Sequence, residues 1–489
     1  MGEPFISLCM IVKNEEKNLP RCLESVRGMV DETVVLDTGS EDNTISICEQ
    51  FGARVYQMAW PGDFASARNE SLKKARGNWI LYLDADETID PNGRPDCIRR
   101  TVSSAATVGA WLAPIRSYKW DSSSFDITHN IRLFQNLPGL LFENEVHERI
   151  EPALARMGVK IAAASFIIDH FGYELAPAVM KEKLERNLLL SQKHLQRLPD
   201  DPYCLYYVGA TLFELQRSSE ALIYFQRALE SQNIPLYLEA MTCNLMAYVE
   251  LREDKLDEAL LHARRSIELA PRQNTAYLVS GIALLRKSEF GKAFELLKKS
   301  HEFQHLPVGR RLTDLSQEHT IVDDIELHRL LGICLSEMGR TREAIDQFGQ
   351  FFALGGMDSE AARRAGLCHV NAGDFTTGLE YLKKAENLGT AQSDLALPLA
   401  FASLKTGDVN GAAQYFRNAR PRNRDELSIA LSVLEAMAAE GAFRPYLTTC
   451  IRGREEAFGR AFPERFLKLM SETRAILPQD TMSSGVPNR

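Results

Sequence analysis

The sequence predicts two parts of different class: an α/β domain with a mostly parallel sheet flanked by helices, followed by an all-α solenoid. Two observations predict this. Up to about residue 100, short β-rich runs alternate with helical segments, which is typical of parallel sheets with right-handed crossovers. From about residue 200, small residues recur at a fixed offset, which is typical of stacked helix pairs. At 489 residues the chain is also too long for a single hydrophobic core.

In the first part, predicted strands alternate with predicted helices. The strands are expected at 5–12, 32–40, 54–58 and 79–83, and the helices at 19–26, 44–53 and 64–77. Ligands of parallel sheets bind beyond the carboxyl ends of the strands. Polar clusters follow three of these strands, at Lys13-Asn14-Glu15, Asp37-Thr38-Gly39-Ser40 and Asp84-Ala85-Asp86. We therefore expect one site assembled from separate loops.

The fourth predicted strand runs directly into acidic residues, in WILYLDADETID (79–90). Side chains alternate with period two along a strand, so Asp84 and Asp86 point the same way at its carboxyl end. Glu87 adds a third acid close by. These acids repel one another unless a cation, or a metal bound to phosphate, lies among them. The cluster favours a divalent-cation site over an ordinary polar strand end.

The second part contains six triplets of mostly small residues, each spaced 12 and then 7 residues apart. The triplets are Gly209, Ala221, Ala228; Ala247, Ala259, Ser266; Gly281, Ala293, Ser300; Gly332, Ala344, Phe351; Gly366, Gly378, Ala385; and Ala400, Ala412, Ala419. Their first members lie 38, 34, 51, 34 and 34 residues apart, and the dominant period of 34 is that of tetratricopeptide repeats. The long gap predicts an insertion near 305–320, as a loop on the binding face or an atypical helix.

These patterns predict five segments along the chain. They are the α/β domain at 1–180, a helical linker at 181–200, the tetratricopeptide array at 201–440, capping helices at 441–475 and a flexible tail at 476–489.

The composition of the chain argues against several classes of function. A net charge of -9 and a pI near 5.7 argue against bulk binding of nucleic acid or of an anionic membrane surface. The sequence has no apolar run long enough for a membrane span and no signal-peptide pattern at its start, so we expect a cytoplasmic protein. Its nine cysteines contain no CxxC pair, which predicts reduced and mostly buried thiols, without disulfides or zinc.

Several phosphate-site motifs do not fit. The sequence contains neither GxxxxGK[ST] nor GxG, which argues against P-loop ATPases and dinucleotide-binding dehydrogenases. DADET matches the first motif of aspartate-nucleophile phosphatases, DxDx[TV]. In that superfamily, however, the motif follows the first strand, whereas here it follows the fourth, and 91–180 shows no later acidic pair at a strand end to complete a magnesium site.

The N-terminal stretch resembles the family 2 glycosyltransferases, which have the A-type nucleotide-sugar-binding fold. The resemblance is carried by SLCMIVKNEEKNLPRCLESV, DETVVLDTGSEDNT, FASARNESLKKARGNWILYLDADE, VHERI and IIDHFGYE, over roughly residues 5–180. With the repeat array, the chain looks like the bacterial subgroup that glycosylates peptides or proteins, such as flagellin- and sublancin-type acceptors.

The resemblance implies roles for individual residues. Those implied to bind the nucleotide-sugar are Ile11, Lys13, Glu15, Asp37, Arg68 and Asp84, with Asp37 accepting from the base imide and Arg68 near the base or phosphates. Ile11 and Lys13 replace the Pro and Tyr often found in the family. Asp84 and Asp86 would be the DxD element, in which Asp86 binds Mn²⁺ or Mg²⁺ and Asp84 contacts the ribose or a metal-bound water.

The segment FENEVHERI (142–150) offers the remaining catalytic groups. As a strand it would place Glu145 and His147 on one face. The zinc-protease motif HExxH is not completed, because Glu151 stands where its second His is needed. By resemblance, His147 would bind the metal or the diphosphate and Glu148 would be the general base, with Glu145 the alternative. His170 could close the pocket or be a structural histidine.

We therefore predict a metal-dependent, inverting glycosyltransferase of hexosyl or N-acetylhexosaminyl groups. Its donor would be a nucleotide-sugar, with UDP expected from family habit, and its acceptor a protein or peptide recruited by the repeats. Two alternatives remain open: a transferase acting on a saccharide or lipid acceptor, and a tetratricopeptide interaction protein with a degenerate transferase domain.

Overall fold

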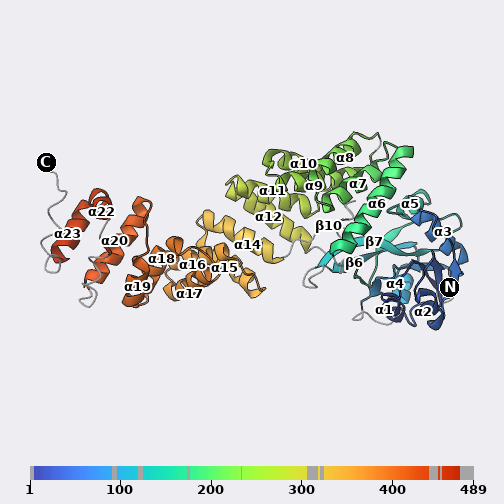
Figure 1. The fold of residues 1–489 in the computed structure, drawn as a ribbon, viewed down its shortest axis with the longest axis horizontal. Coiled ribbons are helices and arrows are strands. Elements are labelled where there is room, and N and C mark those ends of the chain that lie inside the picture. The colour runs from blue at the N-terminus through green and yellow to red at the C-terminus, as the bar shows by residue number, and fades with distance from the viewer. Residues whose placement is uncertain are drawn as a thin grey trace. The chain divides into compact units, whose positions relative to one another are not determined.

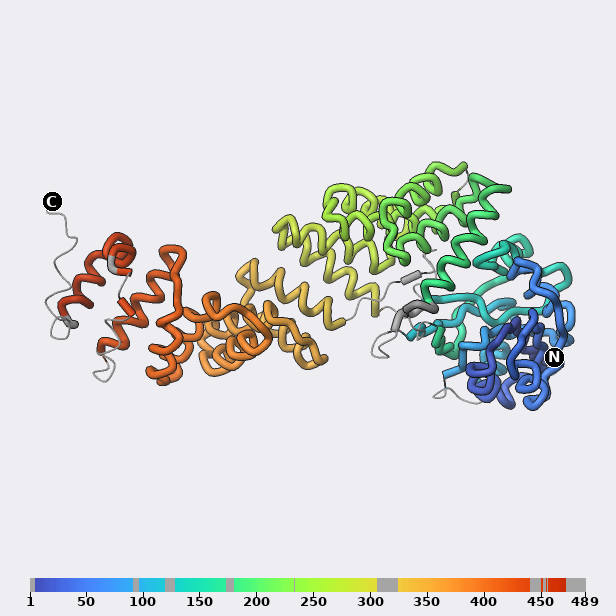
Figure 2. Tube along the Cα trace, viewed as in Figure 1, coloured from blue at the N-terminus to red at the C-terminus, as the bar shows by residue number. Residues whose placement is uncertain are grey.

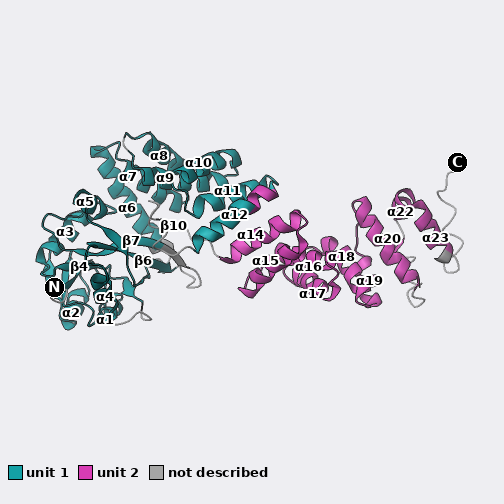
Figure 3. Cartoon of the chain, turned by 180° about the vertical axis from the view of Figure 1, so that it is seen from behind, with its two compact units in different colours: residues 1–289, 295–323 teal, residues 290–294, 324–489 magenta. Residues whose placement is uncertain are grey.

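The computed structural model describes residues 5–90, 96–118, 125–172, 177–232, 234–305, 318–319, 324–439, 450–451 and 454–473 (Figure 1). Its contacts divide the chain into two compact units, coloured separately in Figure 3. They are residues 1–289 with 295–323, and residues 290–294 with 324–489.

The four predicted strands form a parallel half-sheet in the order β3-β2-β1-β4. The elements are β1 (Ile6–Val12), α1 (Leu19–Ser25), β2 (Glu32–Asp37), α2 (Thr44–Gln50), β3 (Arg54–Gln57), α3 (Phe64–Lys74) and β4 (Trp79–Tyr82). β1 lies between β2 and β4 and is buried along nearly all its length, which is why its sequence reads as a continuous apolar run. The predicted alternation of strands and helices is confirmed.

Beyond β4 the sheet becomes mixed. The additional elements are β5 (Glu87–Ile89), α4 (Cys97–Ser104), β6 (Ala110–Tyr118), β7 (Phe125–Gln135), α5 (Glu151–Arg156), β8 (Ile161–Ala163) and β9 (Ile168–His170). β7 pairs antiparallel with both β4 and β6. β9 pairs parallel with β6 and antiparallel with β5, placing His170 opposite Glu87. This last pairing brings His170 beside the acidic cluster.

Helix pairs follow the sheet in the first unit (Figure 1). They are α6 (Pro177–Arg197), α7 (Pro202–Glu214), α8 (Ser218–Glu230), α9 (Leu236–Arg252), α10 (Leu256–Leu269), α11 (Thr275–Arg286) and α12 (Phe290–Gln304), whose residues 290–294 are assigned to the second unit. α6 covers most of the predicted linker and packs against α7.

The second unit continues with helices, and Figure 2 shows the path of the chain through them. They are α14 (Asp324–Glu337), α15 (Thr341–Ala353), α16 (Ser359–Asn371), α17 (Phe375–Asn387), α18 (Gln392–Lys405), α19 (Val409–Phe416), α20 (Arg424–Ala439), α22 (Glu455–Ala461) and α23 (Pro463–Thr473). None of the described helices of either unit has the length and apolarity that crossing a membrane requires.

The small residues of the repeat pattern lie where paired helices touch. A Cβ added to Gly209 of α7 would come within 2.5 Å of the Phe225 ring of α8, and one added to Gly332 of α14 within 2.7 Å of the Phe348 ring of α15. Each bulky residue follows its glycine by 16 positions. The glycines therefore allow a large side chain of the second helix to pack directly on the backbone of the first.

Parts of the predicted insertion and C-terminal region lie outside the described residues, as does the predicted tail. Of the insertion, Glu318–His319 forms a short strand, β10, antiparallel to β7. The prediction of mostly buried thiols is confirmed, since eight of the nine cysteines are buried and Cys204 is partly exposed.

Candidate active site

A cavity of about 530 Å³ lies at the carboxyl edge of the parallel strands. Eight of the nine side chains expected to form the site line it, namely Ile11, Lys13, Glu15, Arg68, Asp84, Asp86, His147 and Glu148. They come from the end of β1 and the loop after it, from α3, from the turn after β4 and from the segment between β7 and α5. Side chains from separate loops thus line one common cavity, and their role as one functional site stays a prediction.

Arg68 is the centre of the ionic contacts in this cavity. Its NH2 group lies 2.7 Å from Asp84 Oδ1, and its Nε lies 2.6 Å from Glu148 Oε1. The guanidinium also lies 4.8 Å from the centroid of the Tyr82 ring. Because the Arg68 side chain is only 6% exposed, its charge is balanced by these two carboxylates and not by water.

Arg132 provides a second buried cation next to the acidic cluster. Its NH2 donates to Glu87 Oε1 at 2.6 Å and lies 3.7 Å from Asp84 Oδ2. The other Glu87 oxygen, Oε2, accepts from the Asp84 backbone N–H at 3.0 Å. Arg68 and Arg132 therefore separate acids that otherwise repel one another, and Glu87 is held as a structural residue.

The same contacts set the protonation of these acids. Burial raises the pKa of Asp84, but the guanidinium groups of Arg68 and Arg132 outweigh burial and hold this pKa well below its usual range. Burial raises the pKa of Glu87 to about 6, despite Arg132. Asp84 is thus the permanently ionised acid, and with 37% of its side chain exposed it can still meet a ligand from the cavity.

His170 lies against Asp86 at the end of β9. Its Nε2 is 3.5 Å from Asp86 Oδ2, and its Nδ1 is 3.1 Å from Ser117 Oγ. Burial lowers the pKa of His170, but the carboxylate of Asp86 outweighs burial and raises it. A carboxylate oxygen is a suitable ligand for Mn²⁺ or Mg²⁺, and the imidazole nitrogen beside it suits the transition metal Mn²⁺ better than Mg²⁺. These residues fit the predicted metal.

Gly172 leaves the space that this pair needs. A Cβ at position 172 would clash with both His170 Nε2 and Asp86 Oδ2. The glycine therefore allows the backbone to pass directly beside the two candidate ligands.

His147 lies elsewhere in the cavity wall. Its backbone is left-handed, with φ of +55°, and its ring stacks on Tyr207 of α7, with centroids 3.8 Å apart and planes inclined by 8°. Burial lowers the pKa of His147 to about 4, and its Nε2 is buried without a hydrogen-bond partner among the described residues. The geometry favours His170 over His147 as the histidine ligand beside Asp86.

The segment around His147 is a closed loop, and its interpretation as a strand is wrong. Only an isolated antiparallel bridge joins Glu143 and Arg149, with both backbone hydrogen bonds 2.8 Å long. Glu148 faces the cavity, whereas the Glu145 carboxylate pairs with Arg197 of α6. Between the two candidate bases, the loop therefore presents Glu148 to the cavity.

Arg149 fastens this loop to the helical repeats of the same unit. Its NH1 donates to Tyr237 Oη of α9 at 2.8 Å, and its guanidinium lies 4.3 Å from the centroid of the Tyr203 ring of α7. Together with the stacking of His147 on Tyr207, these contacts make the first repeats part of the support of Glu148.

Asp37 is the predicted residue that does not line the cavity. It is 1% exposed, and its Oδ1 accepts from the backbone N–H groups of Gly39 and Ser40 at 3.0 Å each. These bonds form the turn after β2, so that Thr38 lines the cavity instead. The predicted contact of Asp37 with the base stays a prediction.

Several cavity residues are missing from the predicted site, among them two aromatic and two cationic side chains. Trp60 and Phe64 form an edge-to-face pair with centroids 4.7 Å apart, and Lys183 and Arg186 reach the cavity from α6. The aromatic pair lies in WPGDF (60–64), at the start of the helix that carries Arg68, and aromatic residues beside a Pro-Gly turn are the signal by which it could have been found. The two cations lie more than 90 residues after the DxD element, and only the fold brings them close.

Comparisons with known proteins agree with this arrangement. Residues 7–147 match the family described as glycosyl transferase family 2, and residues 330–394 match the tetratricopeptide repeat. A TPR repeat-containing protein of Synechococcus elongatus is 29% identical over 270 residues, or 52% of this chain and 64% of that protein. The SPbeta prophage-derived glycosyltransferase SunS of Bacillus subtilis is 27% identical over 235 residues, or 47% of this chain and 54% of that protein.

Two further comparisons gave a shorter sequence match and a match to a solved structure. An uncharacterized glycosyltransferase of Rickettsia felis is 38% identical over 84 residues, or 17% of this chain and 29% of that protein. The solved structure of YrrB, a TPR protein with an unusual peptide-binding site, matches 44% of this chain and 97% of its own, with 17% identity and a TM-score of 0.31. The alignments span less than two thirds of the length of each curated relative named here. The chain thus has an N-terminal domain of the family 2 glycosyltransferase type, matched over residues 7–147, followed by a helical region that contains tetratricopeptide repeats.

Proposed function

We propose that this glycosyltransferase moves a sugar from a nucleotide-sugar to a protein or peptide acceptor, with a divalent metal and with inversion at the anomeric carbon. The observation that carries the proposal is the contact of Arg68 with both Asp84 and Glu148 in one cavity. It places the acid expected at the donor and the acid expected at the acceptor on a single guanidinium. A degenerate domain has no reason to keep both.

Donor binding follows from the groups in the cavity wall. Trp60 and Phe64 offer aromatic faces for a nucleobase or a sugar ring. Lys13, Lys183 and Arg186 are cations that can pair with a diphosphate. Asp86 and His170, with Asp84 beside them, would hold Mn²⁺ or Mg²⁺. A divalent ion bound there would neutralise the charge that develops on the leaving diphosphate.

Transfer would then be a single displacement. The acceptor oxygen or nitrogen attacks the anomeric carbon while the bond from this carbon to the diphosphate oxygen breaks. Glu148 takes the proton of the acceptor, and the electron pair of the broken bond leaves with the nucleoside diphosphate. Arg68 orients the Glu148 carboxylate, and the contacts of Arg149 with Tyr203 and Tyr237 hold the loop that carries it.

The tetratricopeptide array is the feature that favours a macromolecular acceptor. Stacked helix pairs provide an extended surface for a polypeptide, whereas a small acceptor gains nothing from them. The expected cytoplasmic location and the UDP nucleotide stay predictions. A saccharide or lipid acceptor is the alternative that shares the same donor site.

The experiment that separates these acceptors is transfer from radiolabelled nucleotide-sugars in a lysate of the source organism. We expect label that depends on the enzyme and is released by protease. Label that enters the lipid extract or protease-resistant polysaccharide would contradict the protein acceptor. A Glu148→Gln enzyme is the matched control for label incorporated by other transferases.

A further inference from the structure

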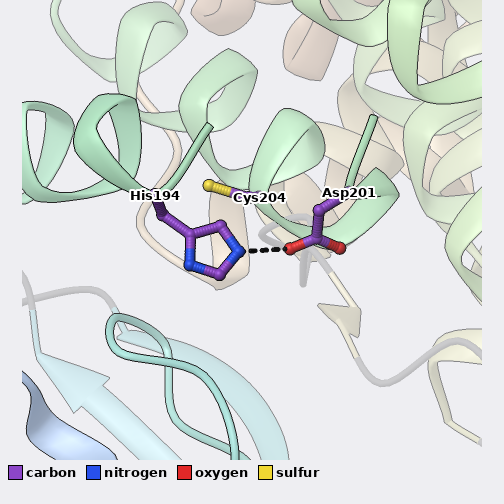
Figure 4. A group of neighbouring side chains, drawn as sticks. All are labelled: His194, Asp201 and Cys204. Atoms are coloured by element: carbon purple, nitrogen blue, oxygen red, sulfur yellow. Dashed lines mark hydrogen bonds and ion pairs between the residues drawn. The ribbon is translucent and has the colours of Figure 1, made fainter. Parts of the chain in front are cut away.

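A second group of potential metal ligands lies at the turn between α6 and α7, outside the donor cavity. It consists of His194 near the end of α6, Asp201 at the start of α7 and Cys204 in its first turn. Figure 4 shows the imidazole and the carboxylate facing each other with the sulfur beside them. One ligand atom from each residue lies within 4.8 Å of the other two.

Hydrogen bonds fix the orientation of these three side chains. His194 Nε2 lies 3.0 Å from Asp201 Oδ2. The other carboxylate oxygen, Oδ1, accepts from the Tyr203 backbone N–H at 3.2 Å, which holds Asp201 as the cap of α7. The Cys204 thiol donates to the Ser191 carbonyl at 3.1 Å. Asp201 Oδ2 is thus already fixed toward the imidazole.

A small cavity adjoins these three side chains. Its volume of about 10 Å³ is close to the space of one water-sized sphere. His147 also lines it, together with Asn144 and Val146 of the loop that carries Glu148. His147 Nε2 is buried and has no hydrogen-bond partner within the described part of the chain. The wall of the small cavity therefore includes a fourth potential nitrogen ligand without a partner.

We propose that His194, Asp201 and Cys204 bind a structural Zn²⁺ at the turn between α6 and α7. Thiolate sulfur, imidazole nitrogen and carboxylate oxygen together select zinc, whereas Mg²⁺ and Mn²⁺ prefer oxygen-rich sites. Binding forms a zinc–sulfur bond and releases the thiol proton to solvent.

The expectation of no zinc rested on the lack of a CxxC pair. Here the ligands are spaced His-x6-Asp-x2-Cys across a turn between two helices, and this spacing matches none of the usual zinc motifs. A zinc ion at this turn would fix it beside the loop that holds Glu148. The proposed site is thus structural and separate from the catalytic metal at Asp86.

Cobalt substitution tests the site directly. Co²⁺ bound by a thiolate gives a near-ultraviolet charge-transfer band, and Asp84, Asp86 and His170 contain no sulfur that could produce one. We expect full-length protein in excess Mg²⁺ to bind Co²⁺ with this band, and zinc to displace it. Cys204→Ser should remove the band, whereas Cys368→Ser, at a buried thiol of α16, should leave it unchanged.

His194→Gln provides a second variant if the serine variant does not fold. Its amide can keep a hydrogen bond to Asp201 but is a poor zinc ligand, so metal affinity should fall by at least about tenfold while the circular dichroism spectrum is retained. No thiolate band in wild-type protein saturated with Co²⁺, or a band unchanged in Cys204→Ser or in folded His194→Gln, would overturn the proposal.

Discussion

Among the individual residues of the site, Arg68 connects the two acids Asp84 and Glu148 through its guanidinium group. Loss of either Asp84 or Glu148 would leave the buried Arg68 guanidinium with one carboxylate partner in place of two, and each such charged hydrogen bond contributes about 1.5–3 kcal/mol. The sequence predicts that Arg68 belongs to the site, and the Arg68 side chain lines the cavity. It does not reveal the pairing, because Glu148 follows 80 residues later and only the fold brings the two together.

Glu148 should be the general base and Glu145 should not. Glu148→Gln keeps the size of the side chain but cannot accept a proton, so we expect transfer to fall by about 10²–10⁴-fold with donor affinity nearly unchanged. Glu145→Gln loses only the exposed pair with Arg197 and serves as the matched control. Transfer kinetics and donor calorimetry measure the two quantities. If the Glu145 variant is the inactive one, the roles are reversed.

Gly172→Ala should weaken the binding of the metal proposed at Asp86 and His170. The added Cβ would push His170 Nε2 and Asp86 Oδ2 apart, and we expect Mn²⁺ affinity to fall by about tenfold or more. Titration followed by Mn²⁺ electron paramagnetic resonance measures this affinity. Gly349→Ala, at a helical glycine with open space around it, is the control. Unchanged Mn²⁺ affinity in Gly172→Ala would exclude this pair as ligands.

His147 and His170 show that the choice between two candidate metal ligands could not be made from the sequence. His147 sits in the motif-bearing segment and was therefore assigned to the metal, while His170 was left with two possible roles. The choice depends on the pairing of β5 with β9, which sets His170 opposite Glu87. Strands of three residues carry too little periodicity for such a pairing to be predicted.

Elements were predictable where their pattern was long or repeated. The strands β1 to β4 and the three helices among them follow an unbroken alternation, and the six triplets repeat one spacing. The antiparallel pair of β6 and β7 was not predicted. β6 contains Pro114, and β7 carries polar residues such as His129 and Asn130 in its middle, so neither strand shows a plain strand pattern.

Two glycines of one helix pair should respond in opposite ways to alanine. A Cβ at Gly332 of α14 meets the Phe348 ring at 2.7 Å, whereas a Cβ at Gly349 of α15 meets nothing within 4 Å. Gly332→Ala should lower the free energy of unfolding by about 1–3 kcal/mol through overpacking. Gly349→Ala should raise it by about 0.5–1 kcal/mol. Urea unfolding measures both, and equal effects would contradict the packing described for the repeats.

For the molecule as a whole, a cavity in the second unit is a candidate surface for the proposed acceptor. A cavity of about 500 Å³ lies among α16, α18 and α20. Apolar side chains such as Leu367, Leu397 and Ile429 line it together with arginines such as Arg363 and Arg422. Arg363 and Arg422 already pair with Glu360 and Asp394 of the same wall, so the lining combines apolar side chains with ion pairs and suits a polypeptide segment that presents both apolar and charged side chains.

Ile429→Glu should raise KM for the native acceptor by about tenfold and leave donor hydrolysis unchanged. Ile429 is 39% exposed, so the charge can be placed there without unfolding α20. Ile223→Glu, at a 59% exposed position of α8 that does not line this cavity, is the control. An unchanged acceptor KM in the Ile429 variant would show that the acceptor binds elsewhere.

The combination of a transferase domain with an array could be predicted from motifs and period alone. The support of the catalytic loop by the array could not, because it depends on single contacts of His147 and Arg149 with tyrosines of α7 and α9. Single contacts of this kind produce no repeated pattern in a sequence from which they could be predicted.

The most direct test of the account is the hydrolysis of a panel of nucleotide-sugars by wild-type enzyme and by Asp86→Asn, with Mn²⁺ and in excess chelator. The account predicts that wild-type enzyme with Mn²⁺ hydrolyses at least one donor, that chelation abolishes this activity and that restored Mn²⁺ recovers it. Asp86→Asn should remain folded and inactive with Mn²⁺. Full hydrolysis in excess chelator, or an Asp86→Asn enzyme as active as wild type, would contradict a metal-dependent transferase site at the end of β4.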